Sequence, residues 1–287
     1  MASPRPGCLL ALGDSITQGS SGHMSYRHPL WKRLVDTGLN FTWAGSNRWA
    51  YGATGPTRAP YRQLTFPDVH EGHWGWRTDE VLNSLAAWQA TYSCVPTCVL
   101  LHLGTNDMWQ GNAALDVVAR ISTIIDQLQC TNGTSVTVLL AVPIPTCTER
   151  MSALAQPIID VARTRSNVFA VDHATGWDYG AHTYDNCHPD STGAQLMADA
   201  WLAAINDHCV GAPPPAPPPA PPPPVPPSAC ASARPPASPP LSPQTRFPPI
   251  YLPFGAILLA MMGGCLGFNR RLRRQCACGV TRDRSFQ

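Results

Sequence analysis

Short apolar runs alternate with longer segments of mixed apolar and polar residues through residues 8–208. The runs predict strands, and the middle ones are continuously apolar, as in strands buried on both faces. The predicted strands are Cys8–Leu12, Asn40–Ala44, Cys98–Leu103, Val136–Val142 and Asn167–Val171. The mixed segments predict helices near Tyr26–Asp36, Thr78–Ala90, Ala113–Gln129, Ser152–Arg165 and Thr192–Asp207. This alternation is typical of an α/β three-layer sandwich, with helices on both faces of a central parallel sheet, here five-stranded.

The alternating pattern ends near residue 210, and three segments of different composition follow. Residues 211–249 hold 19 of the 31 prolines, which predicts an extended spacer of polyproline II type. Residues 250–268 contain no charged side chain and are long enough to cross a bilayer as a helix. Residues 269–287 form a short basic tail that contains cysteines. We therefore expect a globular domain over residues 1–210, followed by a linker, a membrane helix and a tail.

The charge of the chain is distributed unevenly between these segments. Residues 1–210 carry 12 Lys and Arg against 17 Asp and Glu, whereas residues 211–287 carry 8 against 1. The net charge of +2 therefore reflects a basic tail and not a basic globular domain. Nucleic-acid binding by the globular domain is excluded on this ground, since such domains carry a basic patch or stripe.

The segments that flank the globular domain bear on where the protein resides. The apolar residues before Gly13 lead directly into a Gly-Asp-Ser sequence, so we interpret them as a strand and not as a cleaved signal peptide. Either the domain is cytosolic on a tail anchor, or the true start lies upstream. The sequence NRRLRR after the apolar segment and the sequons at Asn40 and Asn132 favour a single-pass membrane protein with an extracellular or lumenal domain.

Seven cysteines lie within residues 1–210, without the paired CxxC spacing of a zinc site. Cys94 and Cys98 are near enough in sequence to close a small loop by a disulfide. Cys147 and Cys187 lie in loops that we expect at the same edge of the sheet, which makes them a second candidate pair. An odd count leaves at least one thiol unpaired. The histidines lack ligand spacing such as HExxH, so we predict no metal and no other cofactor.

Polar residues follow the first and third predicted strands, and others precede the final helix. Ser15 follows the first strand, Asn106 the third, and Asp185 and His188 come just before the last helix. In such sheets the functional site lies beyond the carboxyl ends of the strands, so we expect these side chains to converge. Ester hydrolysis needs a nucleophile, a base and oxyanion donors, and this set supplies each. Asp185, three residues before His188, is spaced to orient its imidazole.

The motifs around these residues resemble those of the SGNH, or GDSL-type, hydrolases over about residues 8–208. The matching blocks are GDSIT, EGHWGWRTDEV, GTND and DNCHP, in the order of the family. The resemblance implies a flavodoxin-like α/β fold. It also implies that Ser15 is the nucleophile, that His188 is the general base and that Asp185 orients His188.

The same resemblance implies the donors of an oxyanion hole. These are the backbone amide of Ser15, the amide of Gly75 in preference to that of Gly72, and the side chain of Asn106. Asp14 is adjacent to the nucleophile, and we expect it to bond backbone amides of its loop instead of acting as the base.

Aromatic side chains flank the predicted site. Trp74, Trp76 and Trp109 are candidate substrate-binding residues, together with His73, because aromatic faces suit the C–H surfaces of sugars; core packing is the alternative role for each. Arg77 is expected to hold its loop through a carboxylate.

The form of the four blocks is most similar to carbohydrate esterases of the acetyl-xylan-esterase type, family three. This similarity implies an acetylated sugar polymer as substrate. The sequence therefore predicts a serine esterase that removes acetyl groups from a carbohydrate through an acyl-enzyme. One alternative is a lysophospholipase or short-chain lipid esterase, which a membrane segment would suit. Another is a non-catalytic surface protein that binds carbohydrate, although the intact Ser15, Asp185 and His188 argue against it.

Overall fold

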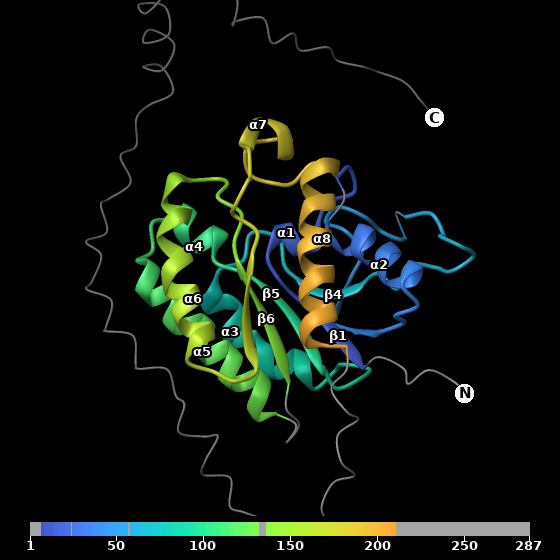
Figure 1. Cartoon of the computed structure of the whole chain (residues 1–287), viewed down its shortest axis with the longest axis horizontal. Coiled ribbons are helices and arrows are strands. Elements are labelled where there is room, and N and C mark those ends of the chain that lie inside the picture. The colour runs from blue at the N-terminus through green and yellow to red at the C-terminus, as the bar shows by residue number, and fades with distance from the viewer. Residues whose placement is uncertain (1–6, 24, 57, 132–135, 211–287) are drawn as a thin grey trace, which may run out of the picture. The chain divides into compact units, whose positions relative to one another are not determined.

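Figure 1 shows the computed structural model of the chain, which describes residues 7–23, 25–56, 58–131 and 136–210. The predicted linker (211–249), membrane helix (250–268) and basic tail (269–287) lie outside these residues, as does the sequon at Asn132. Within the described ranges, no helix is long and apolar enough to cross a membrane. The fold is therefore that of the predicted globular domain.

A mostly parallel sheet runs through the centre of this domain (Figure 1). Its strands are β1 (Cys8–Gly13), β2 (Thr42–Ala44), β3 (Asn47–Arg48), β4 (Val69–Gly72), β5 (Cys98–His102), β6 (Thr137–Val142) and β7 (Val168–Asp172). Their order is β3-β4-β1-β5-β6-β7, with β2 also paired to β1. Only the β3–β4 pair of these strands is antiparallel. The predicted α/β class and all five predicted strands are confirmed, but the expected five-stranded sheet has seven strands in the described residues.

The missed strand β4 is short and polar, yet it is buried. Its His70 donates from Nε2 to the Trp49 carbonyl oxygen at 3.0 Å. Its Glu71 accepts bonds from the amide and the hydroxyl of Ser46, each at 2.8 Å. These partners lie more than 20 residues away in the sequence. Because the buried residues of β4 are polar, the sequence shows no apolar run that would predict a strand there.

One edge of strand β1 pairs with a single strand, and its other edge pairs with two. β5 pairs along one edge, from Leu9 to Gly13. On the other edge, β2 pairs with Cys8–Leu10 and β4 pairs with Leu12 and Gly13. The loop that follows β4 is therefore brought beside the end of β1, where Ser15 begins the next element.

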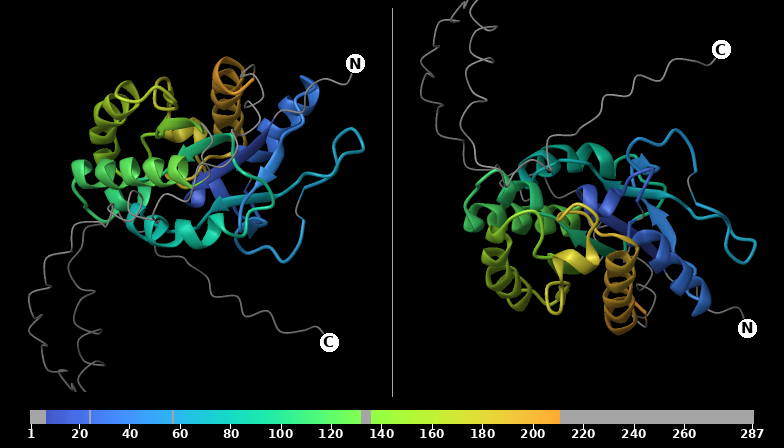
Figure 2. Two further views of the ribbon diagram at one scale, coloured as in Figure 1. Left: turned by 90° about the horizontal axis from the view of Figure 1, so that it is seen from below. Right: turned by 90° about the horizontal axis from the view of Figure 1, so that it is seen from above.

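Helices cover both faces of the sheet (Figure 2). On one face lie α2 (Arg27–Asp36) and α8 (Ser191–His208); on the other lie α3 (Thr78–Gln89), α5 (Ala114–Cys130) and α6 (Ala155–Arg163). All five helices match predicted ones. Shorter helical turns are α1 (Ser15–Gln18), α4 (Thr105–Trp109), α7 (Tyr179–His182) and a 3-10 helix, η1 (Glu149–Leu154).

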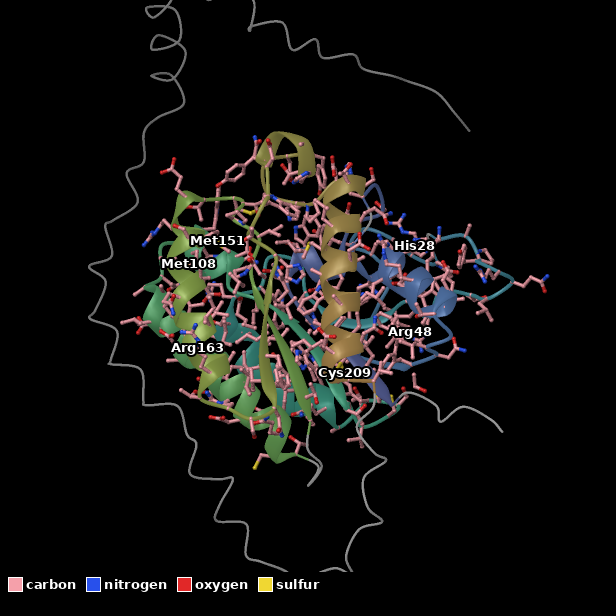
Figure 3. The ribbon with its side chains drawn as sticks, viewed as in Figure 1. His28, Arg48, Met108, Met151, Arg163 and Cys209 are labelled. Atoms are coloured by element: carbon pink, nitrogen blue, oxygen red, sulfur yellow. A yellow bond between two sulfur atoms is a disulfide. The ribbon has the colours of Figure 1, made fainter. Side chains whose placement is uncertain are left out.

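The strands contribute alternate residues to two hydrophobic cores. Leu10 and Leu12 of β1 pack with α3, α5 and α6, and Met108 and Met151 join this core (Figure 3). Leu9 and Ala11 pack with α2 and α8. Burial on both faces explains why the central strands are apolar without interruption.

Two of the disulfides each join cysteines that belong to the same hydrophobic core. Cys94 is bonded to Cys8, and Cys98 is bonded to Cys209 at the end of α8 (Figure 3). The predicted Cys94–Cys98 pair is wrong because the two residues face opposite sides of the sheet: Cys94 belongs to the core of α3 and α5, and Cys98 to that of α2 and α8.

The other two predictions about cysteines have opposite outcomes. Cys147 is bonded to Cys187, which confirms that candidate pair. Cys130 is also disulfide-bonded, so the expected unpaired thiol is not found among the cysteines of the described residues.

Candidate active site

Ser15 is placed by the abrupt change from strand β1 to helix α1. Asp14 caps α1, and its Oδ1 accepts the Ile16 amide at 3.0 Å, as predicted for this carboxylate. Gly13 lets the chain pass close to its neighbours, because a Cβ there would overlap the carbonyl oxygen of His102. Ser15 itself is 5% exposed. The hydroxyl therefore sits on a rigid turn at the carboxyl end of the sheet.

The carboxyl group of Asp14 is buried beside the serine. Loss of hydration raises its pKa to about 6, and the hydrogen bond from the Ile16 amide opposes part of this increase. A carboxyl group with this pKa changes its charge near neutral pH, within the turn that carries Ser15.

His188 is held by a tight turn that begins at Asp185. Oδ1 of Asp185 accepts the amides of Cys187 and His188 at 3.0 and 2.7 Å, and Oδ2 lies 2.8 Å from Nδ1 of His188. Nε2 of His188 lies 2.9 Å from Oγ of Ser15. Because Nδ1 donates to the carboxylate, Nε2 is the acceptor for the serine hydroxyl. The predicted approach of the serine and histidine side chains is thus observed.

The carboxylate of Asp185 is set up to remain charged. Partial burial acts to raise its pKa, but the hydrogen bonds from His188 and Cys187 outweigh burial and lower the pKa below the ordinary value. A negative charge at this position makes Asp185 a strong acceptor for Nδ1 of His188.

A disulfide fixes the histidine loop to the segment after β6. Cys187 is bonded to Cys147, whose amide donates to the Asn186 carbonyl oxygen at 2.9 Å. Cys147 and Asn186 both adopt left-handed backbone conformations, each with φ of 64°. Directly after His188, Asp190 caps α8 by accepting the amides of the residues at 192 and 193.

The loop after β4 carries the candidate oxyanion donors. The His73 amide donates to the Gly13 carbonyl oxygen at 3.0 Å, and the Trp74 amide donates to Oε1 of Gln18 at 2.8 Å, so the loop lies against α1. Gly75 follows in a left-handed conformation, with φ of 80°. The amide of Gly72, the alternative, donates to Nδ1 of His70 and is unavailable.

Asn106 belongs to α4, which begins directly after Gly104. Its Nδ2 donates to the Trp76 carbonyl oxygen at 3.0 Å, which orients the amide and leaves its second hydrogen for another acceptor. Within the described part of the chain, the backbone N–H groups of Ser15 and Gly75 donate to no protein acceptor. The structure therefore leaves donors at each position named for the oxyanion hole.

The four predicted substrate-binding residues have different surroundings. Trp74 lines a hollow beside Ser15. His73 does not line this hollow: its Nε2 donates to Glu71 at 2.6 Å, and its ring contacts those of Trp76 and Trp88, which also contact each other. Trp76 is partly buried and packs against the core of α3 and α5, so the structure favours the alternative of core packing for both residues, and their contact with substrate stays a prediction. Trp109 is 65% exposed at the end of α4, and its role stays a prediction.

Arg77 has the role that was predicted for it. Its guanidinium pairs with both carboxylate oxygens of Asp79, at 2.9 and 3.0 Å, and so fixes the start of α3. Asp107, three residues after Gly104, accepts the amide and hydroxyl of Thr78 and so joins α4 to the same point.

The hollow beside Ser15 has a cavity volume of about 10 Å3. Its lining includes two aromatic residues that the sequence interpretation missed, His23 and Tyr184. Tyr184 directly precedes Asp185, so its position next to the last block was a usable signal, whereas nothing in the sequence connects His23 to the site. No cluster of three potential metal ligands is found among the described residues.

The sequence matches one known protein family. The sequence profile of the GDSL-like lipase/acylhydrolase family matches residues 11–196. The chain belongs to this family. Membership of the GDSL family, together with the Ser15–His188–Asp185 arrangement, identifies an enzyme that hydrolyses ester bonds.

Solved structures share the fold of this GDSL enzyme. A family 3 carbohydrate esterase from Talaromyces cellulolyticus is 24% identical with a TM-score of 0.61, over 70% of this chain and 96% of that one. A family 3 carbohydrate esterase from Clostridium thermocellum is 24% identical with a TM-score of 0.59, over 70% and 95%. An acetyl esterase mutant solved with an acetate ion is 23% identical with a TM-score of 0.61, over 70% and 96%. No curated protein sequence matches the chain significantly.

Proposed function

We propose that the protein is a serine esterase in which Ser15 attacks the ester carbonyl. The observation that carries this proposal is the 2.9 Å contact between Oγ of Ser15 and Nε2 of His188. His188 takes the hydroxyl proton as the bond to the carbonyl carbon forms, and Asp185 stabilises the resulting imidazolium. His188 then gives the proton to the departing alcohol, which leaves an acyl group on Ser15. Water, activated by His188 in the same way, releases the acid.

The oxyanion that forms during attack needs donors that are in place beforehand. We assign this role to the amides of Ser15 and Gly75 and to the second Nδ2 hydrogen of Asn106. The support is that the two amides have no acceptor among the described residues and that the Asn106 side chain is already oriented by Trp76. Preorganised donors of this kind need no rearrangement during the reaction, and removing one typically costs about 10²- to 10³-fold in rate.

The substrate that we propose is an acetylated carbohydrate. The hollow of about 10 Å3 beside Ser15 is only about the size that one water molecule needs, so a short acyl group suits it better than a long chain. His23 is exposed and belongs to the lining, so we assign the solvent-facing side of the hollow to the alcohol portion of the ester. Two of the similar structures are described as carbohydrate esterases and a third as an acetyl esterase, which supports the same substrate class.

The proposed location is a membrane surface, with the domain extracellular or lumenal and residues 250–268 as the anchor. Three disulfides join described residues, and disulfides of this kind persist in oxidising compartments. Protease protection of the domain in sealed vesicles, combined with glycosidase sensitivity, tests this location. Digestion of the domain from the cytosolic side would contradict it.

The Ser15→Ala variant tests the mechanism. It should lose essentially all hydrolysis of p-nitrophenyl acetate and all labelling by a fluorophosphonate, while its melting temperature stays close to that of the wild type. Ser152→Ala, at an exposed serine of η1, is the matched control and should keep both properties. Retained activity in Ser15→Ala would overturn the assignment of the nucleophile.

A series of p-nitrophenyl esters and acetylated xylan tests the substrate. Activity that is highest with acetyl esters and includes release of acetate from the polymer supports the carbohydrate assignment. Activity that rises from acetyl to octanoyl esters would support a lysophospholipase or short-chain lipid esterase instead.

A further inference from the structure

The imidazole of His188 is in contact with two aromatic rings that lie nearly parallel to it. The ring of Trp74 is 4.6 Å away between centroids with an interplanar angle of 17°. The ring of Tyr184 is 5.8 Å away with an angle of 18°. The first ring comes from the loop after β4 and the second from the residue before Asp185, so two separate segments supply them.

Each of these rings is supported in turn by another ring. Tyr51 stacks on Trp74 with centroids 4.7 Å apart, and His23 stacks on Tyr184 with centroids 3.4 Å apart. The indole of Trp74 is therefore engaged by Tyr51 and by His188 and is poorly available as a flat surface for a sugar. This changes the role that the sequence indicated for Trp74.

The hydrogen bonds of His188 require its imidazole to keep one orientation. Its two ring nitrogens are bonded at opposite ends, to Asp185 and to Ser15. Rotation of the ring about the Cβ–Cγ bond would swing both nitrogens out of these contacts and turn the Nε2 lone pair away from the hydroxyl. Flat rings that are parallel to the imidazole oppose this rotation, because tilting it would bring its edge into their faces.

We propose that Trp74 and Tyr184 are positioning residues that hold the imidazole of His188 in the plane required for proton transfer from Ser15. The proposal deepens the proposed function and rests on it. Aromatic faces also attract a cation, so the same rings stabilise the imidazolium that forms during attack. Neither residue touches the reacting ester bond in this role; both act through His188.

A role in positioning and a role in sugar binding predict different kinetics. If Trp74 acts through His188, its loss lowers kcat with small esters and slows the reaction of Ser15 with a fluorophosphonate, which has no sugar. If Trp74 binds the sugar, its loss raises KM for acetylated xylan and leaves both of the other quantities unchanged. The inactivation rate constant therefore separates the two roles.

The experiment uses the full chain with Trp74→Leu and Tyr184→Leu, each beside its ring-retaining partner Trp74→Phe or Tyr184→Phe. We expect both leucine variants to lose about tenfold in kcat for p-nitrophenyl acetate and in the fluorophosphonate inactivation rate constant, with KM little changed. The phenylalanine variants should recover most of both losses. Tyr179→Leu, which removes a ring 41% exposed in α7, is the matched control and should react like the wild type.

The outcomes separate this inference from the proposed function. A wild type that reacts with the fluorophosphonate and a Trp74→Leu variant that reacts equally fast would overturn the positioning role alone. Loss in the phenylalanine variants as large as in the leucine variants would also overturn it, since the volume of the side chain and not its flat ring would then matter. A wild type that does not react would overturn the proposed function and this inference together. Melting temperatures close to that of the wild type show that the variants are folded.

Discussion

The two halves of the active site are held in place by different means. Ser15 lies on a turn that continues a buried strand, and the preceding Gly13 is paired to β4 on one side and to β5 on the other. His188 lies on a surface loop, where the side chain of its partner Asp185 is 40% exposed. The position of the nucleophile is thus determined by the core of the fold. That of the base is determined by a few local bonds, which makes it the easier half to disturb without unfolding the protein.

The largest expected effect is on the buried half. Gly13→Ala places a methyl group against the carbonyl oxygen of His102 and the hydroxyl of Thr17. Because the backbone of a central strand cannot move away, we expect the free energy of unfolding to fall by more than about 3 kcal/mol in urea titrations. Gly22→Ala is the matched control, since a Cβ there meets open space, and should leave the stability unchanged. Equal stability of the two variants would contradict the comparison.

The next largest effect is expected on the exposed half, and on activity alone. Asp185→Asn keeps an oxygen for the amides of Cys187 and His188 but removes the charge opposite Nδ1. We expect kcat for p-nitrophenyl acetate to fall by roughly 10²- to 10⁴-fold, with an unchanged circular dichroism spectrum.

A matched control exists for Asp185 on the neighbouring turn. Asp178 accepts the amides of Gly180 and Ala181 in a similar geometry but has no link to Ser15. Asp178→Asn should keep its activity. A similar loss in both variants would show that the turn, and not the charge, is what matters.

Asp14, in the buried half, should make the free energy of unfolding depend on pH. The folded-state pKa of Asp14, about 6, is above the ordinary value of 3.8, so between these values the folded protein binds more protons than the unfolded chain. The stability from this group is complete below pH 3.8 and is lost as the pH rises through 6. Asp14→Asn keeps the cap on Ile16 without this titration. Relative to this variant, the wild type should lose about 2 kcal/mol between pH 4 and pH 7 in denaturation curves. A difference that is the same at both pH values would exclude this titration.

The smallest effect is expected from removal of the disulfide that connects the histidine loop to the segment after β6. Removal of the Cys147–Cys187 disulfide, in a variant with serine at both positions, frees a turn whose backbone is left-handed at Cys147 and Asn186. We expect kcat to fall about tenfold, equivalent to about 1.4 kcal/mol, as the loop samples other conformations. Mild reduction of the wild type should have the same effect.

The Cys8–Cys94 disulfide supplies the control for this experiment. It joins the start of β1 to the segment before β5 and is remote from the histidine loop. Its removal should lower the melting temperature and leave kcat unchanged. If both disulfides affect kcat equally, the histidine loop has no special dependence on its own bond.

The fold could be predicted where burial leaves a pattern in the sequence. β5 and β6 were found because strands covered on both faces are continuously apolar, and α5 was found because its segment mixes apolar and polar residues between two such runs. β4 was missed because its buried residues are polar, and their partners come from distant segments. The pairing of Cys94 and Cys98 was wrongly predicted because separation along the chain does not reveal which face of the sheet a side chain occupies.

Those residues of the candidate site that lie in the sequence motifs could be predicted. The positions of Ser15, His188 and Asp185 follow from the order of strands and from the spacing of the last block. The ring contacts around His188 could not be predicted, since they depend on how separate loops fold over the edge of the sheet. The same reason explains why His73 was expected in the pocket: its packing against Trp88 is a contact between loop and helix.

The bond between Cys98 and Cys209 has a consequence for how the enzyme meets its substrate. Helix α8 begins beside His188 and extends for 18 residues, about 27 Å, to a point fastened to the first residue of β5. The chain therefore leaves the domain at the edge of the sheet that is remote from Ser15. The last described residues therefore lie away from Ser15, and the C-terminal end of α8 leaves the surface around the serine uncovered.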